Sequence, residues 1–433
     1  MSPSTPRADI LDAFTGRIKP VKVKPTYQLA LVAVTLAMVL LPMIYLGIIG
    51  ATGFAVFRYA IDGLSLFDTV SNAKSALFLY ATPLFVGAVA VVFLVKPLFS
   101  RTLDESPTHS LDPGAEPTLF AFVEKLCREV GAPTPKRIDV DCQVNASASF
   151  RRGASSLFGN DLVLTIGMPL ARGLSLEQLA GVLAHEFGHF AQGAGMRLTY
   201  VVRSINGWFA RVVYERDSWD AKLDDGAKRA EEVGLLLWLA VQASRGMVWL
   251  TRRILWALMH AGHAISCYLM RQMEFDADRY EARLVGSRTF ASTARDLSLL
   301  GAGQQVAMAR LRETFPLGHL VDDMPELIHE LRHRLEPDVV DQINRRRLEE
   351  KTGAFDTHPA DVDRERSAAR ETDPPAFRSE LPATALFSDF GALARTVSRR
   401  FLEAQVGDAM AKTTLLPARE LLALTDQARG DRE

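Results

Sequence analysis

Length, composition and charge exclude several classes of protein for this chain. Its 433 residues allow roughly two or three compact units. The net charge of −1 gives no electrostatic reason to expect nucleic acid as a partner. Three cysteines, far apart in the sequence, form neither a disulfide framework nor a zinc–thiolate cluster. Their small number suits a reducing compartment.

Two uncharged segments near the N-terminus predict membrane helices. Residues 25–57 and 75–95 contain no Asp, Glu, Lys or Arg, and each is long enough to match the roughly 20 residues that cross a bilayer. The first exceeds one crossing, so we expect it to tilt, or to break near Pro42 or Gly50. Lysine and arginine are concentrated in residues 1–24 and just after the second segment, which favours a cytoplasmic N-terminus and a cytoplasmic main domain.

The elements that follow are predicted from periodicity and turn residues. Residues 116–130 have helical spacing, whereas residues 137–144 and 161–166 are strand candidates, the first because its apolar residues alternate. Ser175 starts the next helix, and Gln178 completes a capping box three residues later.

That helix carries a His-Glu-x-x-His motif. His185 and His189 lie one turn apart on the same face, so both imidazoles can reach one Zn²⁺. Glu186 lies about 100° round the helix from His185, within reach of the same ion. Small or flexible residues flank this face, so we expect nothing bulky to block the metal; they are Gly181, Gly188, Gln178 and Gln192.

Glu274 is the candidate third ligand. Catalytic zinc sites use three protein ligands and keep one position for water. Glu274 and Asp278 share one face of a predicted helix, with Arg271 one turn earlier. One carboxylate would bind zinc and the other would hydrogen-bond a histidine ligand. Taken alone, this segment is more typical of a solvated helix with salt bridges, and the upstream motif reverses that preference.

The motif letters occur a second time, at residues 329–333. There the histidines point away from the apolar stripe of their helix, and Arg332 and Arg334 would repel a cation. We therefore expect a charged surface at this place rather than a metal site. His260 and His263 are expected to be packing residues rather than ligands.

Together the motifs resemble those of the membrane-bound zinc metalloproteases that include the heat-shock protease HtpX and the CAAX prenyl endopeptidases. In that family a Thr-His-Pro sequence follows the two metal helices, with an arginine shortly after it. Thr357-His358-Pro359 and Arg364 match this element, and Asn145-Ala146 matches a strand before the zinc helix. The resemblance covers roughly residues 120 to 370.

The chain departs from the family pattern at two places. Glu365 stands where the family usually has an apolar residue. Ser147 and the pair Arg151-Arg152 follow Asn145-Ala146 and make the match of that strand weaker. None of these residues is a proposed metal ligand.

The resemblance implies a mainly α fold with N-terminal transmembrane helices. The catalytic part would be an α+β zincin-type metalloprotease domain with a zinc helix, a small sheet and a second ligand helix. The implied partners are a protein or peptide substrate, bound extended beside an edge strand, and the lipid bilayer. The implied setting is membrane-protein quality control in a bacterial inner membrane, with the catalytic domain on the cytoplasmic side.

The same resemblance implies a role for each site residue. His185, His189 and Glu274 would bind Zn²⁺, and Glu186 would act as general base. His358 and Arg364 would lie near the scissile carbonyl and donate hydrogen bonds to the oxyanion. Asp278 would orient a ligand histidine or assist proton transfer. The alternatives are a zinc-binding membrane scaffold or chaperone-like pseudoprotease, against which the intact Glu186 argues, and a plain anchor protein with a chance motif.

The expected domain organisation has six parts. They are a basic cytoplasmic segment (1–24), a transmembrane hairpin (25–99), a linker (100–116), the metalloprotease domain (117–370), its helical insert (198–270) and a C-terminal helical accessory segment (371–433). The insert is as readily membrane-associated as buried, because its apolar stretches contain several arginines.

Overall fold

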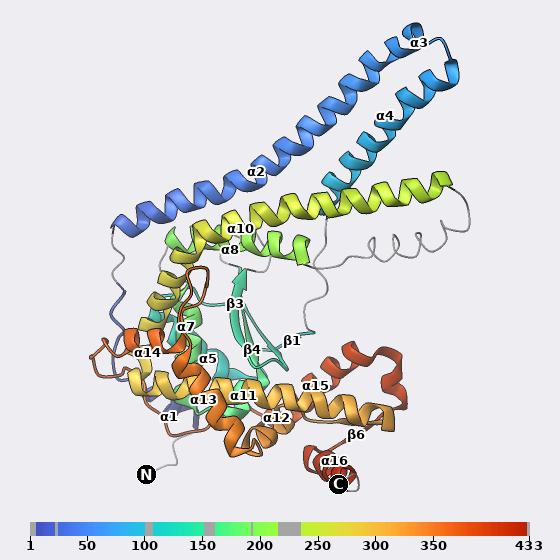
Figure 1. Ribbon diagram of the computed structural model, residues 1–433. Helices are drawn as coiled ribbons and strands as arrows, with labels where there is room; N and C mark the ends of the chain where they lie inside the picture. Colours follow the sequence, from blue (N-terminus) through green and yellow to red (C-terminus); the bar gives the residue numbers. More distant parts are fainter. Residues whose placement is uncertain are drawn as a thin grey trace, which may run out of the picture. The chain divides into compact units, whose positions relative to one another are not determined.

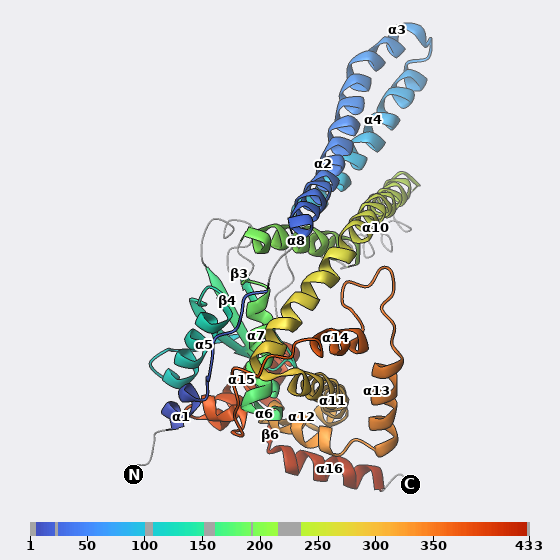
Figure 2. The ribbon, with the colours of Figure 1, turned by 90° about the vertical axis from the view of Figure 1, so that its left-hand side faces the viewer.

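The computed structural model describes residues 6–21, 25–99, 107–150, 161–191, 194–214 and 235–430 (Figures 1 and 2). The chain divides into two compact units. Unit 1 comprises Met1–Lys24, Asp104–Arg197 and Leu269–Glu433, and unit 2 comprises Pro25–Leu103 and Leu198–Tyr268. The predicted fold class is confirmed, since the chain is mostly helical with two small sheets in its described parts.

Unit 2 contains a helical hairpin. Helices α2 (Pro25–Asp62) and α4 (Ala73–Val95) lie side by side and are joined through the short helix α3 (Leu66–Thr69) (Figure 1). The helix α2 runs through Pro42 without ending. Of the two alternatives for the first apolar segment, the structure therefore shows the long helix and not the break.

The hairpin helices do not have the burial of core helices. By length and composition both can cross a membrane, yet only 28% and 11% of their most apolar windows are buried. A core helix of a soluble protein would bury most of that surface. Large apolar side chains are instead exposed along both helices, among them Leu29, Leu36, Phe54, Phe57, Leu77, Phe78 and Phe85.

The helical insert packs on α2 within unit 2. It is formed by α8 (Ala194–Tyr214) and α10 (Leu235–Val285). A Cβ atom added at Gly262 of α10 would meet Leu41 and Met38 of α2, and the rings of Tyr45 and Trp208 lie edge to face. The sequence suggested separate insert and ligand helices, but α10 is one helix that continues through Glu274 into unit 1.

Unit 1 contains a four-stranded sheet of order β1-β2-β4-β3. Strands β2 and β4 are parallel, whereas β1 and β3 pair antiparallel at the two edges. The zinc-motif helix packs against β3, so the edge strand lies beside the motif. The strands are β1 (His109–Ser110), β2 (Arg137–Asp141), β3 (Ala146–Phe150) and β4 (Leu162–Gly167).

Helices cover this sheet and extend unit 1 beyond it. A second sheet pairs β5 (His319–Val321) with β6 (Thr414–Leu416) in parallel, which ties the C-terminal segment to the middle of unit 1. The helices are α1 (Pro6–Asp12), α5 (Pro117–Val130), α6 (Met168–Gly173), α7 (Leu176–Gly188), α11 (Ser287–Thr314), α12 (Met324–His333), α13 (Pro337–Glu349), α14 (Asp361–Ala368), α15 (Phe390–Val406) and α16 (Ala418–Gly430).

The helices α11 and α12 approach closely at a glycine. A Cβ atom at Gly303 would lie 2.8 Å from the backbone oxygen of Ile328 and 3.2 Å from the backbone nitrogen of Arg332. Two residues earlier on the same helix, Gly301 has nothing within 4 Å of that position. The two glycines thus differ in packing while sharing one helical backbone.

We expect alanine to act in opposite directions at these two positions. Gly303→Ala forces backbone groups apart and should lower the free energy of unfolding by about 1–3 kcal/mol. Gly301→Ala removes only the entropic cost of glycine in a helix and should raise it by up to about 1 kcal/mol. Thermal unfolding of the detergent-purified protein measures both, and equal effects at the two sites would contradict the close packing.

Candidate active site and metal centre

The helix α7 is fixed at its start and along its apolar side. The predicted capping box is confirmed, because Ser175 Oγ accepts from the Gln178 amide while Gln178 Oε1 accepts from the Ser175 amide. The residues that face the core are fully buried: Leu176, Leu179, Leu183 and Phe187. His185 is in the last turn and His189 is the C-cap residue, still in helical conformation. The motif histidines are therefore held by a rigid, anchored helix.

Two glycines let α10 reach α7. A Cβ atom at Gly188 would lie 3.0 Å from the ring of Tyr280 and 3.2 Å from the Cα of Ala277. At Gly181 it would lie 3.0 Å from Val285 and 3.1 Å from a carboxylate oxygen of Glu281. The space beside the motif is thus filled by α10. The two glycines therefore make room for α10, and the expectation that nothing bulky blocks the metal stays a prediction.

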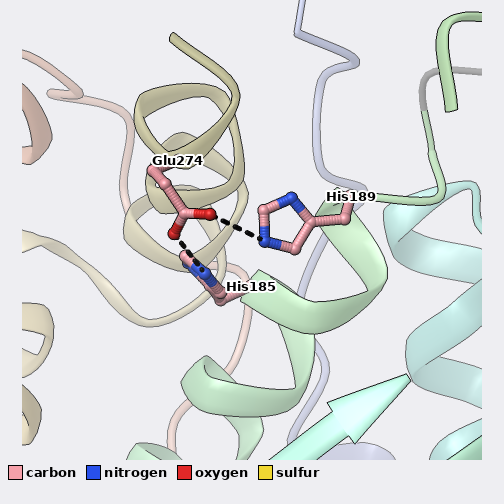
Figure 3. Close-up of side chains that lie close together, drawn as sticks. All are labelled: His185, His189 and Glu274. Atoms are coloured by element: carbon pink, nitrogen blue, oxygen red, sulfur yellow. Dashed lines mark ion pairs between the residues drawn. The ribbon is translucent and has the colours of Figure 1, made fainter. Parts of the chain in front are cut away.

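Three ligand groups converge between these helices (Figure 3). Glu274 Oε2 is 3.5 Å from His185 Nε2, and Glu274 Oε1 is 3.7 Å from His189 Nε2. Their side chains are only 12%, 9% and 4% exposed for His185, His189 and Glu274. The structure therefore brings together all three predicted ligands.

The three groups fit a zinc ion. Ligands about 2.0–2.1 Å from a tetrahedral zinc lie roughly 3.4 Å from one another. One donor atom from each residue lies within 4.8 Å of the others, so a small contraction would close the shell. Two imidazoles and one carboxylate are also the ligand set of catalytic zinc sites with an open fourth position.

Asp278 lies against the first histidine. Its Oδ1 lies 3.0 Å from His185 Nδ1, so the other ring nitrogen faces Glu274. Arg364 donates two hydrogen bonds to the same carboxylate, of 3.0 Å from Nε and 2.6 Å from Nη2. Asp278 is fully buried, and the arginine supplies the counter-charge that a buried carboxylate requires.

The charge states of these groups follow from their neighbours. Burial would raise the pKa of Asp278, but the Arg364 charge and the hydrogen bonds outweigh it and hold that pKa below its usual range. Burial would also raise the pKa of Glu274, and the hydrogen bonds from His185 and His358 lower it. Burial would lower the pKa of His185, and the Asp278 and Glu274 carboxylates instead raise it to about 10. A metal ion at His185 would therefore displace a proton.

A further buried acid, which the sequence analysis did not identify, lies beside His185. Glu281 is 5% exposed, and its Oε2 lies 4.0 Å from His185 Nδ1. Burial raises its pKa to about 7, with Asp278 adding to the effect and His185 opposing it. Glu274, Asp278 and Glu281 follow at steps of four and three along α10, which is the spacing of one helical face. This spacing is the sequence pattern from which Glu281 could have been predicted as a third acid of the site.

The residues of the Thr-His-Pro element also join the site. His358 Nδ1 lies 3.4 Å from Glu274 Oε2, while the His358 side chain is 69% exposed. Its outer face is exposed to solvent. Arg364 is 24% exposed and is directed at Asp278. This contact supports a role in holding Asp278, and the oxyanion role of Arg364 stays a prediction.

The second motif copy has no third ligand among the described residues. His329 and His333 lie on α12 with ring centroids 4.7 Å apart, and no metal-binding group of three residues includes them. Burial, Arg172 and His333 lower the pKa of His329 to about 4. Arg332 donates to the backbone of Gly173 and to Asp296. The side chain of His329 is therefore half-buried, whereas the sequence predicted a solvated, charged surface here.

Comparison with known proteins places this site in a family. Residues 113–372 match peptidase family M48, a range that includes every ligand and carboxylate described above. The chain belongs to peptidase family M48. The predicted resemblance is thereby confirmed at the level of the family.

Curated relatives agree with this assignment. The chain is 27% identical over 303 residues to Protease HtpX of Pseudomonas putida, covering 68% of this chain and 87% of the relative. It is 28% identical over 223 residues to a Protease HtpX homolog of Bordetella petrii, covering 50% and 69%. Among solved structures, the crystal structure of S. mikatae Ste24p matches with 14% identity and a TM-score of 0.26, covering 77% of this chain and 66% of that one.

Removal of Arg364 should destabilise this M48 domain strongly. Arg364→Ala removes the arginine counter-charge of the fully buried Asp278, whose contact with His185 remains, and should cost about 3–5 kcal/mol of unfolding free energy. Arg366→Ala is the control two residues along α14, where an exposed pair with Asp363 is lost and a change below about 1 kcal/mol is expected. Thermal unfolding measures the loss of stability in each of the two variants relative to wild type.

The pH dependence of the same pair has a definite sign. Since the pKa of Asp278 is lowered on folding, the pair contributes fully above the ordinary value near 3.9 and is lost only at more acidic pH. The stability advantage of wild type over Arg364→Ala should therefore shrink as the pH falls into the acidic range, where the Asp278 carboxylate becomes protonated. Thermal unfolding at a series of pH values measures this, and an advantage that is unchanged at acidic pH would contradict the ionised Asp278.

Proposed function

We propose that this chain is a membrane-anchored, zinc-dependent endopeptidase. The observation that carries the proposal is the convergence of His185, His189 and Glu274, with Asp278 behind the first histidine. Glu186 follows His185 directly in the chain. The M48 match supports peptide-bond hydrolysis. The resemblance to the heat-shock protease implies membrane-protein quality control as its setting.

Each site residue then has a defined task. A zinc ion, when bound, supplies Lewis-acid chemistry that acidifies a water molecule and polarises a carbonyl group. Glu186 accepts the proton of the attacking water and returns it to the leaving amine. Asp278 keeps the His185 Nδ1 proton in place, so that Nε2 stays available as a ligand. His358, with its exposed outer face, donates a hydrogen bond to the developing oxyanion.

The strand β3 is the proposed platform for the substrate. Within the described part of the sheet it pairs with β4 alone, so its other edge can hydrogen-bond an extended peptide. The zinc helix packs against this strand, which brings a bound peptide close to the metal. Ser147, Ala148 and Ser149 present small side chains along it and leave room for those of the substrate.

The catalytic unit is proposed to lie on the cytoplasmic side of a bacterial inner membrane. The segment before α2 is part of unit 1, since the Val21 amide donates to Tyr280 Oη and Arg283 donates to the Lys19 carbonyl. The chain after α4 also returns to unit 1. Both ends of the hairpin therefore continue into unit 1 and should lie on the same side of the membrane. The basic N-terminal residues favour the cytoplasmic side.

Hydrolysis and metal content test the enzyme together. Detergent-purified wild type should bind one zinc ion and cleave an unfolded reporter protein. Glu186→Gln should keep the zinc and lose at least about a hundredfold in rate, because the general base is gone. Glu274→Gln should lose zinc, while His329→Ala at the second motif copy should keep both zinc and activity.

Two results would contradict the proposal. Cleavage by Glu186→Gln at the wild-type rate would refute the mechanism. Zinc binding without cleavage by any preparation would favour the alternative of a zinc-binding scaffold.

Cysteine labelling tests the orientation. The three native cysteines are buried, so single new cysteines can be labelled selectively. In spheroplasts an impermeant maleimide should label Ser71→Cys, between α3 and α4, and should not label Arg128→Cys on α5, whose native side chain is 64% exposed. Both should react after lysis. The reverse pattern in spheroplasts would place the catalytic unit outside.

A further inference from the structure

The loop that carries His358 is long and projects from the protein surface. It joins α13 to α14 over residues 350–360 (Figure 2). Phe355 within it is 65% exposed. Three residues later, His358 contacts Glu274 through one ring nitrogen while most of its side chain faces solvent. The position of this ring therefore depends on how the loop itself is held.

Side-chain contacts fix the two ends of the loop. At the α13 end, Arg347 donates from Nε to Asp361 and from Nη2 to Glu365, at 2.7 and 2.8 Å. Thr352 donates to Asp363 at 2.6 Å and accepts from the Ala360 amide at 2.9 Å. These contacts join α13 to α14 and close the base of the loop, but they do not reach its middle.

One arginine of α10 reaches the middle of the loop. Arg271 Nη1 donates to three backbone carbonyls, those of Gly353 at 3.2 Å, Ala354 at 3.0 Å and Asp356 at 2.8 Å. These carbonyls belong to a tight turn, in which the Gly353 amide donates to Asp356 Oδ2 at 2.6 Å. The guanidinium group of Arg271 thus binds three carbonyl groups of the turn that lies just before His358.

The position of Arg271 on α10 links this turn to the metal ligands. Arg271 lies three residues before Glu274, about one helical turn away. The same rigid helix therefore holds Glu274 and, through Arg271, the loop whose histidine contacts Glu274. Both groups keep their relative position as long as the arginine holds the turn.

We propose that Arg271 is a positioning residue that holds the loop of residues 350–360 so that His358 stays beside Glu274. The proposal deepens the proposed function and rests on it for the role of His358. Without Arg271 the turn loses three charge-assisted hydrogen bonds, and the exposed His358 ring samples positions away from the reaction centre. A displacement of about 1 Å at a catalytic group can cost up to a hundredfold in rate.

Hydrogen exchange tests the clamp without any need for turnover. In the full-length, zinc-loaded protein, Arg271→Ala should speed exchange of the Gly353 and Ala360 amides by about tenfold or more, since local opening becomes easier. Arg271→Lys should give an intermediate result, because an ammonium group keeps the charge but reaches fewer carbonyls. Zinc content should stay at the wild-type level in both variants.

Arg279→Ala is the matched control on the same helix. Arg279 donates to Glu371 at 2.6 Å, so this variant also loses an arginine contact between α10 and a neighbouring segment. It should leave exchange in residues 350–360 unchanged. Equal acceleration in both variants would mean general loosening of α10 and would overturn the proposal, as would unchanged exchange in Arg271→Ala.

A double-mutant cycle tests whether Arg271 acts through His358. We expect Arg271→Ala to lower kcat by about tenfold with little change in KM. In a His358→Ala background the same substitution should change the rate by less than about twofold, because the group it positions is already gone. Additive losses, or loss of zinc in Arg271→Ala, would overturn the proposal.

The two measurements separate this proposal from the proposed function. If wild type does not hydrolyse the reporter, the endopeptidase proposal fails, while the exchange comparison still decides whether Arg271 holds the loop. If wild type is active and Arg271→Ala exchanges and turns over like wild type, only the positioning role fails.

Discussion

The close approach of α7 to α10 is the constraint on which the site depends. Gly188 and Gly181, two turns apart on α7, have no room for a Cβ atom because α10 lies against them. At this separation, carboxylates on the facing side of α10 reach the imidazoles of α7 directly. Any larger side chain at these positions would push the helices apart and open the shell of ligands.

This contact creates an unusual concentration of buried acids. Glu274, Asp278 and Glu281 are each 5% exposed or less, and burial without counter-charge would be costly. Arg364 neutralises one of them by two hydrogen bonds. His185, which contacts all three, supplies a second positive centre in the absence of metal. A divalent cation at His185, His189 and Glu274 would take over that charge, which is the electrostatic reason to expect one here.

The loop over the site shows how a departure from the family pattern is accommodated. Glu365 replaces an apolar residue, and in this chain it accepts a hydrogen bond from Arg347 of α13. The same arginine also holds Asp361, so α13 is fastened to the helix that supplies Arg364. Glu365 therefore takes part in an ion pair at the base of the His358 loop and does not contact the candidate metal ligands.

The sequence by itself determined the local features of this protein. The capping box at Ser175, the spacing of His185 and His189 and the uncharged length of α2 depend on residues close in the chain, so periodicity and spacing predict them. The expectation that the second motif copy is no metal site also rests on local spacing, because its histidines lie opposite an apolar stripe.

Only the tertiary structure decided which distant groups meet. Glu281 shares a helix face with Glu274, but its burial beside His185 depends on the α7–α10 contact. The parallel pairing of β5 with β6 and the hydrogen bonds of Arg271 to residues 353–356 likewise join segments far apart in sequence. Such contacts depend on side-chain packing between elements, and the spacing of residues along the chain does not predict that packing.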